Sequence, residues 1–512
     1  MSPSNTGFQI KLGAALSYTA LGLNILIGLF YTPWMIRSIG KADYGLFVLA
    51  MSVITLFIFD FGLSAAITRF IAGYLAEKRS DKVRDCLGIV YKIYFCLDGI
   101  IFVVLAGIYF CIPLIYRELT PAELEKFKVV FVIASVFSVI SFPFIPVSGI
   151  LNAYEKFIQV KACDLAHKII VVASMSVCLL CGYGLYALVL LNAGAGILTI
   201  ILKLICIQKF TDAKINFRYS NRAERNAILG YSGWVTVIAL AQRCIFNIAP
   251  SMLGMLSGTS DIAVFGIAMT LEAYVFTFAS ALNGMFLPMV SRITASEEKD
   301  LLPLMTKIGR IQIFIIGYLT LGYFILGRIF IRLWVGPAFD AVYLCAAFLI
   351  LPSFFQLPQE IASTAVAVMN KVKYQAWVFV AMAIINLLFG FAVIPVWGVK
   401  GLSLSICIAY LIRTAGMNII YYRVLNIDIF SFFRNTFIKL LPPLLAAALL
   451  GLGFNYLIPR SNWLFFFIKG MLFTAAYACV MYFLGMNQYE RDLIMKPVRK
   501  ILTIKKRLFT DE

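Results

Sequence analysis

Long apolar windows recur along this chain, and they constrain its fold more than any other feature. Each window holds about 20 mostly apolar residues, enough to cross a bilayer as a helix. The 512 residues are 62% hydrophobic and only 13% charged, with a mean hydropathy of +0.92. Barrel strands would instead alternate apolar and polar residues. We therefore predict an all-α integral membrane protein.

We predict fourteen transmembrane spans. The first follows "MSPSNTGFQI" with no short apolar region and no small-residue cleavage site, so we expect no cleavable signal peptide. The approximate limits of the spans are 10–36, 44–74, 86–116, 128–151, 160–184, 185–207, 227–255, 260–290, 309–335, 341–369, 374–396, 399–423, 435–458 and 463–486.

The distribution of basic residues predicts the orientation. With a cytoplasmic N-terminus, the cytoplasmic segments hold about four times as many Lys and Arg residues as the outer loops, as the positive-inside rule requires. Both termini are then cytoplasmic, and the basic amphipathic tail 487–512 lies on anionic lipids. The net charge of +19 is explained without nucleic acid as a partner.

The cysteines and the single histidine give no sign of a cofactor. Most of the 11 cysteines fall inside apolar runs, where cysteine behaves as a small buried hydrophobe. Cys178 and Cys181 have CxxC spacing, but no second pair accompanies them. We expect neither a metal nor an organic cofactor; coupling to H⁺ or Na⁺ stays open.

An internal repeat divides the chain. Pro33 matches Pro250 at an offset of 217, and Asp43 matches Asp261 at an offset of 218. Six spans separate the copies, so both copies have the same orientation across the membrane. We predict an N-terminal lobe of spans 1–6 (1–209), a cytoplasmic linker (210–226) and a C-terminal lobe of spans 7–12 (227–423). Two additional spans (435–486) and the tail (487–512) follow.

Short motifs in the first 160 residues carry a family resemblance. They are the proline that ends span 1, the turn "GKADYGL", the segment "DFGLSAA" and the later "AYEKF". With them the chain resembles the Wzx-type oligosaccharide-lipid flippases of polysaccharide biosynthesis, in the multidrug/oligosaccharidyl-lipid/polysaccharide (MOP) superfamily. The resemblance implies a multi-pass protein of the bacterial inner membrane. It would move a polyprenyl-diphosphate-linked oligosaccharide to the outer leaflet by alternating access.

Ionisable residues inside the spans are the candidate site residues, because a charge in the membrane is costly without a role. Arg243 and Asn247 lie one turn apart in span 7. Glu272 in span 8 is at the same predicted depth as Arg243. We expect the two to form an ion pair, either permanent or opened when a diphosphate competes for the guanidinium.

Asp60 and Arg69 fall in span 2. In a continuous helix, nine residues separate them by about two and a half turns, so they would face opposite ways. Asp60 is predicted either to bond a neighbouring helix or to act as a coupling or gating carboxylate. Arg69 either extends to the inner interface or contributes to cargo binding.

Three further groups complete the candidate set. Asp164, His167 and Lys168 share one face of span 5, where pairing among themselves and extension to the membrane interface are the alternatives to cargo binding by Lys168. In span 10, Pro352 and Pro358 should break or bend the helix beside Glu360, a gating or hinge candidate. Arg413 in span 12 is a second deep cation for cargo.

These residues favour a transporter over an enzyme. The outer loops are short, and a membrane glycosyltransferase or polymerase would need clusters of catalytic carboxylates or histidines. The cargo of a flippase would be an O-antigen, capsule or exopolysaccharide repeat unit on a lipid carrier. The alternative is a cation-coupled exporter of organic cations. We expect a monomer in contact with membrane lipids; association with polysaccharide-assembly proteins stays open.

Overall fold

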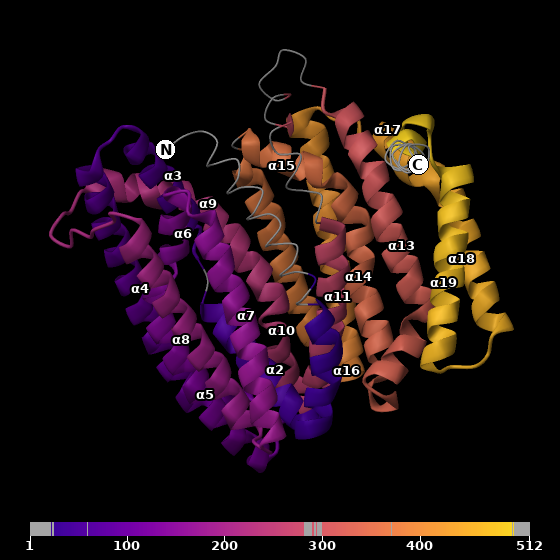
Figure 1. The fold of residues 1–512 in the computed structure, drawn as a ribbon, viewed down its shortest axis with the longest axis horizontal. Coiled ribbons are helices and arrows are strands. Elements are labelled where there is room, and N and C mark those ends of the chain that lie inside the picture. The colour runs from indigo at the N-terminus through magenta and orange to yellow at the C-terminus, as the bar shows by residue number, and fades with distance from the viewer. Residues whose placement is uncertain are drawn as a thin grey trace, which may run out of the picture. The chain divides into compact units, whose positions relative to one another are not determined.

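The structure, a computed structural model, describes residues 22, 25–58, 60–280, 289–290, 293, 300–369, 371–493 and 495. The secondary structure of this described part is helical (Figure 1). The described residues group into two compact units. The first comprises Met1–Ile267 and Val372–Ala409, and the second comprises Ala268–Lys371 and Tyr410–Glu512. These units cut across the predicted lobes, whose boundaries stay a prediction.

The helices of the first unit follow a stretch of helix at Ile25–Ile39. Their bounds are α2 (Lys41–Phe57), α3 (Leu63–Ala76), α4 (Ser80–Ile115), α5 (Pro121–Ser141), η1 (Phe142–Phe144), α6 (Pro146–Ala153), α7 (Phe157–Leu180), α8 (Leu185–Phe210), α9 (Arg222–Phe246), α10 (Ala249–Leu256) and the start of α11 (Thr259–Ser280). The first part of α16 (Val372–Leu425) also belongs to this unit.

The second unit begins within α11 and includes the end of α16. Its other elements are α13 (Leu302–Trp334), η3 (Pro337–Phe339), α14 (Val342–Gln356), η4 (Leu357–Gln359), α15 (Glu360–Val368), α17 (Ile429–Phe433), η5 (Arg434–Ile438), α18 (Lys439–Leu457), α19 (Trp463–Val480) and η6 (Met481–Gly485). Here η1, η3 and η4 are 3₁₀ turns, whereas η5 and η6 are π-helical.

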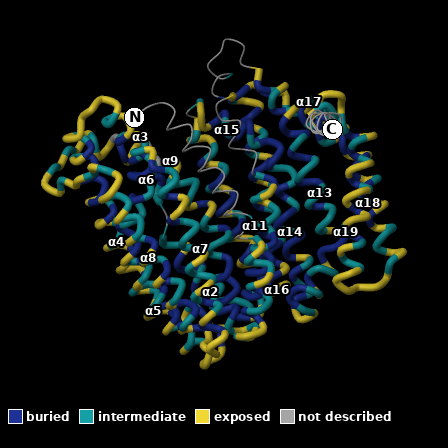
Figure 2. Tube along the Cα trace, viewed as in Figure 1, coloured by how far each residue is buried: buried dark blue, intermediate teal, exposed yellow. Residues whose placement is uncertain are grey.

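Many of the exposed side chains on the long helices are large and apolar, which indicates that lipid surrounds these helices. Figure 2 shows exposed positions along the outer surfaces of the long helices. On α4 these include Phe110 at 79% and Val103 at 67% exposure. Soluble proteins rarely expose contiguous apolar patches of this extent. The chain is therefore a multi-pass membrane protein.

Eleven helices in the described part are long and apolar enough to span a membrane, and up to 12 if the bent pair Ile25–Ile39 and Lys41–Phe57 is one span. The helix α16 has 54 residues, about 80 Å at 1.5 Å per residue, more than twice a hydrocarbon core. It breaks at Gly398 (φ 56°), between the two spans predicted there. The predicted first span, 10–36, lies largely outside the described residues.

The predicted continuous span 44–74 is wrong. The helix α2 ends at Phe57, and α3 begins at Leu63. Between them Phe61 (φ 45°) and Gly62 (φ 66°) are left-handed, a conformation that cannot continue a right-handed helix. The apolar run therefore contains two helices.

The segment that joins α8 to α9 is bound along α4. The Asn216 amide N–H donates to the Arg84 carbonyl at 3.1 Å, and its side chain donates to Asp85 at 2.8 Å. Farther along, Lys92 Nζ donates to the Tyr219 carbonyl at 3.0 Å. The link between the two repeats thus has fixed partners on the first.

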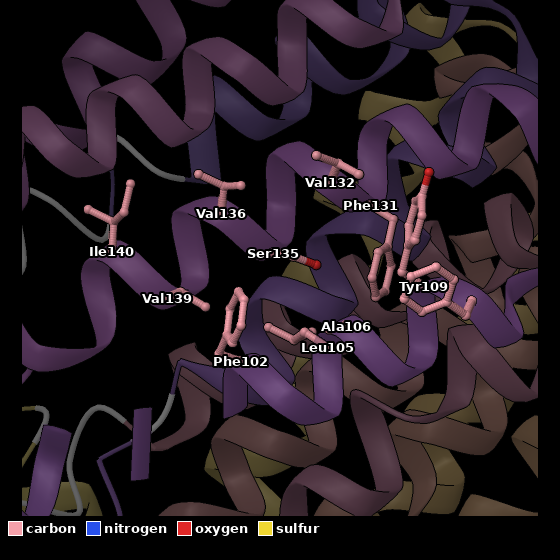
Figure 3. A pocket seen from close by; sticks show the side chains of 11 residues that line it. Phe102, Leu105, Ala106, Tyr109, Phe131, Val132, Ser135, Val136, Val139 and Ile140 are labelled. Carbon is pink, nitrogen blue, oxygen red and sulfur yellow. The ribbon is translucent and has the colours of Figure 1, made fainter. Parts of the chain in front are cut away.

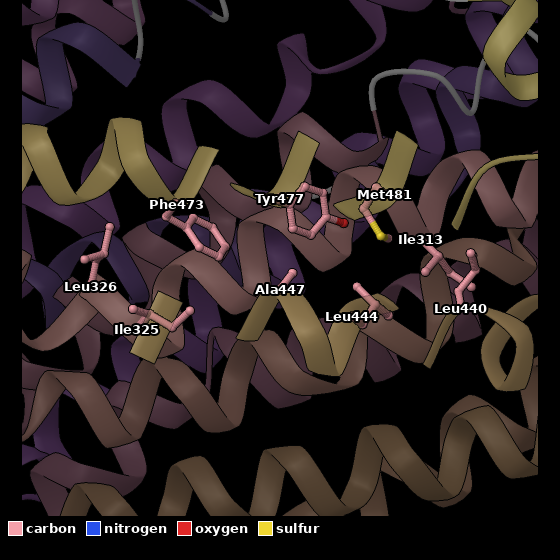
Figure 4. Close-up of a cluster of buried hydrophobic side chains, with 9 residues drawn as sticks. All are labelled: Ile313, Ile325, Leu326, Leu440, Leu444, Ala447, Phe473, Tyr477 and Met481. Carbon is pink, nitrogen blue, oxygen red and sulfur yellow. The ribbon is translucent and has the colours of Figure 1, made fainter. Parts of the chain in front are cut away.

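The last two spans pack on α13 through an apolar core (Figure 4). Its buried members are Ile313, Ile325, Leu326, Leu440, Leu444, Ala447, Phe473, Tyr477 and Met481. One end of α13 is held by an ion pair, because Arg310 Nε donates to Glu490 Oε1 at 2.6 Å and Nη2 donates to Oε2 at 3.0 Å. The same guanidinium donates to the carbonyls of Asn435 and Gly485, which belong to the two π-helical turns.

Two arginines lie near the other end of α13. Arg328 and Arg332 both donate to the Asp340 carboxylate, at 2.6 and 2.7 Å. These two guanidinium groups hold the pKa of Asp340 well below its ordinary value. Their partner therefore lies in the turn between α13 and α14.

Candidate functional site

A broken span in the second unit gathers polar side chains. The helix α14 ends at Gln356, η4 turns through Pro358, and α15 starts at Glu360. Because proline lacks an N–H donor and its ring clashes with the preceding turn, the α-helix cannot pass through this position unaltered. The Gln359 side chain donates to the Phe355 carbonyl at 2.8 Å, and this bond connects η4 to the end of α14. The α-helix is interrupted at Pro358, as predicted, by a 3₁₀ turn, whereas it continues through Pro352.

Arg413 of α16 lines the same break. It is 5% exposed and interacts electrostatically with Glu360. The two residues share a small cavity of about 10 Å³, whose wall comprises Gln356, Gln359, Glu360, Arg413, Thr414, Met417 and Tyr421. This volume holds one water at most. The cavity is therefore too small for a cargo molecule, which could bind here only if these residues moved apart.

Two tyrosines and a second carboxylate extend this cluster. The Tyr410 ring lies 5.9 Å from Arg413 Cζ, within the range of a cation–π contact. Tyr410 also interacts with Glu272 of α11, and Tyr421 interacts with both Arg413 and Glu360. Of the predicted site residues, the structure thus brings Glu272, Glu360 and Arg413 together.

Arg243 and Asn247 form a separate group in the first unit. The Arg243 guanidinium donates to the Thr55 carbonyl. Asn247 Nδ2 donates to the Thr55 hydroxyl at 2.5 Å. The shared face predicted for this pair is confirmed, since both reach one residue of α2. Arg243 and Glu272 belong to different units, and their pairing stays a prediction.

Asp60 has a structural role in the break between α2 and α3. Its carboxylate accepts from the Ser64 backbone N–H at 2.7 Å and from the Tyr94 hydroxyl at 3.1 Å. It therefore satisfies a donor at the start of α3 and ties that start to α4, the predicted bond to a neighbouring helix. Arg69 is exposed on α3. The prediction that they face opposite ways along one helix is wrong, because there is no continuous helix between them.

The predicted pairing within span 5 is also wrong. Asp164 pairs with Lys203 of α8 at 2.8 Å, and Lys203 also donates to the Ser148 hydroxyl. His167 Nδ1 bonds the Thr199 hydroxyl at 2.9 Å. The helices α7 and α8 pack side by side, and this brings partners from α8 to the polar face of α7. Lys168 is half-buried on α7, and its role in cargo binding stays a prediction.

Sequence reasoning missed the tyrosines. Tyr410 precedes Arg413 by three residues, and Tyr421 follows it by eight. Both spacings place a residue on the same helical face, so the signal was present. The missing information was which helix that face meets.

An apolar pocket between α4 and α5, of about 450 Å³, has a different character (Figure 3). Hydrocarbon side chains such as Phe102, Leu105 and Val136 form most of its wall, with Tyr109 and Ser135 as polar members. Such a wall suits a hydrocarbon chain. It offers no charged group to a diphosphate.

The Arg413 cluster can exchange one anion for another. A guanidinium presents donors in a planar fork that suits carboxylate and phosphate oxygens alike. Glu360 can balance the charge of Arg413 when no cargo is present, and a phosphate oxygen can take its place. The amides and tyrosines supply further hydrogen-bonding groups around the same cavity.

Comparisons with known proteins agree with this architecture. Over 94% of its length the chain resembles a lipid II flippase, MurJ, in an inward closed conformation, with 14% identity, a TM-score of 0.73 and 99% of that chain covered. It resembles an inward-facing multidrug resistance MATE family transporter of the MOP superfamily over 82% of its length, with 13% identity, a TM-score of 0.60 and 98% of that chain covered.

A MOP superfamily transporter from Pyrococcus furiosus, described by the reverse polarity of its binding pocket, matches with 11% identity and a TM-score of 0.54. The match covers 83% of this chain and 96% of that one. No curated protein matches at a significant level of sequence similarity. A model of the family described as polysaccharide biosynthesis protein matches residues 11–294, more than half of the chain. The chain thus belongs to the polysaccharide biosynthesis protein family and has the fold of MOP superfamily transporters.

Proposed function

We propose that the protein flips a polyprenyl-diphosphate-linked oligosaccharide from the cytoplasmic to the outer leaflet of a bacterial inner membrane. The cargo class is an O-antigen, capsule or exopolysaccharide repeat unit, moved by alternating access. The observation that carries the proposal is Arg413, a buried guanidinium at a broken span with Glu360 as its exchangeable counter-ion. Family membership supports the same cargo class.

The diphosphate binds Arg413 by displacing Glu360 in this mechanism. With the cavity closed, the Glu360 carboxylate lies in the same cavity wall as Arg413 and interacts with it electrostatically. When the cavity opens, phosphate oxygens occupy the guanidinium fork, and Glu360 is released or takes up a proton. Return of Glu360 to Arg413 then favours release on the other side. Coupling to H⁺ or Na⁺ would act on this carboxylate or on Glu272.

Export of an organic cation is the second candidate. One observation favours it, since the two carboxylates Glu272 and Glu360 share the cluster with the single arginine Arg413. An anionic cargo requires the arginine to dominate the open cavity, and a cationic cargo requires the carboxylates to do so. The fold accommodates both, because it resembles both a lipid II flippase and a multidrug transporter.

Surface glycan in cells that lack their own flippase distinguishes the candidates. The cells receive wild type, Arg413→Ala, Arg413→Lys or the control Arg423→Ala at matched membrane levels. Arg423 is an exposed arginine on the same helix. Loss of one or two charge-assisted hydrogen bonds predicts an export rate about 10- to 100-fold lower for Arg413→Ala. We expect Lys to restore part of the rate and the Arg423 variant to equal wild type.

Each result has a definite reading. If Arg413→Ala exports as well as wild type, the anionic site is elsewhere, and Arg243→Ala is the next variant. If wild type moves no glycan but lowers the sensitivity of the cells to cationic drugs, the exporter candidate replaces the flippase.

A further inference from the structure

Two thiols lie against each other between α7 and α8 of the first unit. The Sγ atoms of Cys163 on α7 and Cys206 on α8 are 4.0 Å apart, although 43 positions separate the two residues in the sequence. Sequence spacing singles out a different pair, Cys178 and Cys181. The fold therefore creates a dithiol that local sequence patterns do not predict.

Polar bonds between the two helices keep the thiols opposite each other. Asp164, the residue after Cys163, pairs with Lys203 of α8 at 2.8 Å. Lys203 and Cys206 are three residues apart and share one face of α8. Farther along α7, His167 bonds a hydroxyl on the same face of α8 at 2.9 Å. The register of two packed helices thus sets the contact between the sulfur atoms.

The two thiols differ in accessibility. Cys206 is partly exposed, whereas Cys163 is only 7% exposed. Cys206 precedes the end of α8 at Phe210, and Cys163 follows the start of α7 at Phe157, so both lie within about 10 Å of the same end of these helices. The charge distribution predicts that this end faces the cytoplasm. A small neutral oxidant from that side meets Cys206 before Cys163.

The dithiol lies where three helices meet. Cys206 packs against the buried apolar cluster of Val147, Leu151 and Val160. The first two residues belong to α6, and the third belongs to α7. A covalent bond between the thiols would therefore fasten α8 to α7 beside α6.

We propose that Cys163 and Cys206 are a peroxide-responsive modification site, at which a reversible disulfide cross-links α7 to α8. The sulfur of Cys206 attacks hydrogen peroxide, an S–O bond forms, the O–O bond breaks, and hydroxide leaves as water with the thiol proton. The product is a sulfenic acid, which the neighbouring Cys163 thiol can resolve. Disulfides in cytosolic surroundings are usually transient and redox-sensing, which suits this site.

The second step closes the disulfide. The sulfur of Cys163 attacks the sulfur of the Cys206 sulfenic acid, an S–S bond forms, the S–O bond breaks, and a second water leaves with the Cys163 proton. In sum, two thiols and one peroxide give one disulfide and two waters. The two electrons that the sulfurs lose reduce the peroxide. A small-molecule dithiol reverses the change by thiol–disulfide exchange.

Counting free thiols tests the pair in membranes that contain the full-length protein. The membranes are treated with hydrogen peroxide, quenched with catalase and denatured in excess maleimide, and the tags are counted by mass spectrometry. Wild type, with its 11 cysteines, should carry two tags fewer after peroxide. Dithiothreitol should restore both tags, because it reduces a disulfide but not a sulfinic acid.

Substitutions locate the pair. Cys163→Ala and Cys206→Ala should each abolish the reversible loss of two tags. The matched control, Cys178→Ala with Cys181→Ala, should still lose two. Peptide mapping of oxidised wild type locates the bond without any substitution, and it should recover a linked pair of peptides that contain Cys163 and Cys206.

A cyclic dione that reacts with sulfenic acids tests the order of the two steps. After peroxide, it should label Cys206 about fivefold more in Cys163→Ala than in wild type, because the thiol that removes the sulfenic acid is missing. In Cys206→Ala, Cys163 should stay close to unlabelled, because it is buried.

The contrary results are equally definite. The proposal is overturned if wild type keeps all of its tags, if the linked peptides contain Cys178 and Cys181, or if Cys163→Ala leaves the dione label on Cys206 unchanged. None of these measurements uses a cargo, so their outcome is independent of the proposed function.

Discussion

Removing the charge of Glu490 should destabilise the second unit strongly. Arg310 and Glu490 form a two-bond ion pair whose side chains are only 9% and 3% exposed. Glu490→Gln would leave the Arg310 guanidinium buried with two backbone carbonyls and no counter-ion. Breaking one partner of a buried pair typically costs about 3–5 kcal/mol. Solvent screening reduces this cost little, because both groups are almost completely buried.

A maleimide dye that fluoresces on reaction with buried thiols can measure the loss in detergent. The second unit supplies the reporter, since Cys345 is a buried thiol that forms no disulfide. For a unit of about 200 residues, this destabilisation lowers the Tm on the order of 10 °C. Asp340→Asn is the control, because it breaks an exposed ion pair and should shift the Tm little.

A double variant shows whether the charge is responsible. Arg310→Met with Glu490→Met replaces both charges by apolar side chains, and it should recover at least half of the loss. An unchanged Tm for Glu490→Gln would mean that the pair contributes nothing net. A double variant no better than the single one would mean that lost contacts, and not an uncompensated charge, cause the effect.

Three smaller predictions concern other parts of the chain. Because the pKa of Asp340 is depressed in the fold, its contribution to stability is complete above its unfolded pKa and is lost as pH falls through the folded pKa. The small Tm difference between wild type and Asp340→Asn should therefore be constant from about pH 5 to 8 and disappear only below about pH 4. Lys469 is 2% exposed and bonds a neutral amide, so Lys469→Met should keep or raise the Tm, and a clear fall would show that the cation is needed. Gly398→Ala should lower the Tm, because φ is 56° and the new Cβ would clash with Asp261; an unchanged Tm would mean that the turn adapts.

The sequence predicts the helices and some of their interruptions because these depend on local chemistry. Apolar windows locate the spans, and Pro358 identifies the bend that positions Glu360. The spacing of Arg243 and Asn247 places them on one face, and the structure shows both at Thr55. Each of these inferences uses residues within one segment of about 20 positions or fewer.

Other features depend on information that local patterns lack. The break beside Asp60 falls in an unbroken apolar run, and hydropathy carries no signal of a left-handed residue such as Phe61. Lys203, the partner of Asp164, is 39 positions away in the sequence, and the sequence alone does not distinguish it from the many other cations that could pair with Asp164. Only the packing of α7 on α8 selects it.

The docked segment between α8 and α9 has a consequence for biosynthesis. Asn216 binds α4 through its backbone and its side chain, and the helices that precede it are already synthesised when it emerges from the ribosome. Chains are made in seconds to minutes, and N-terminal parts generally fold first. The first repeat can thus bind this segment before the second repeat is complete. Two separately expressed fragments divided after this segment should then reassemble. A division before it would leave α4 of the first fragment without the segment that binds it.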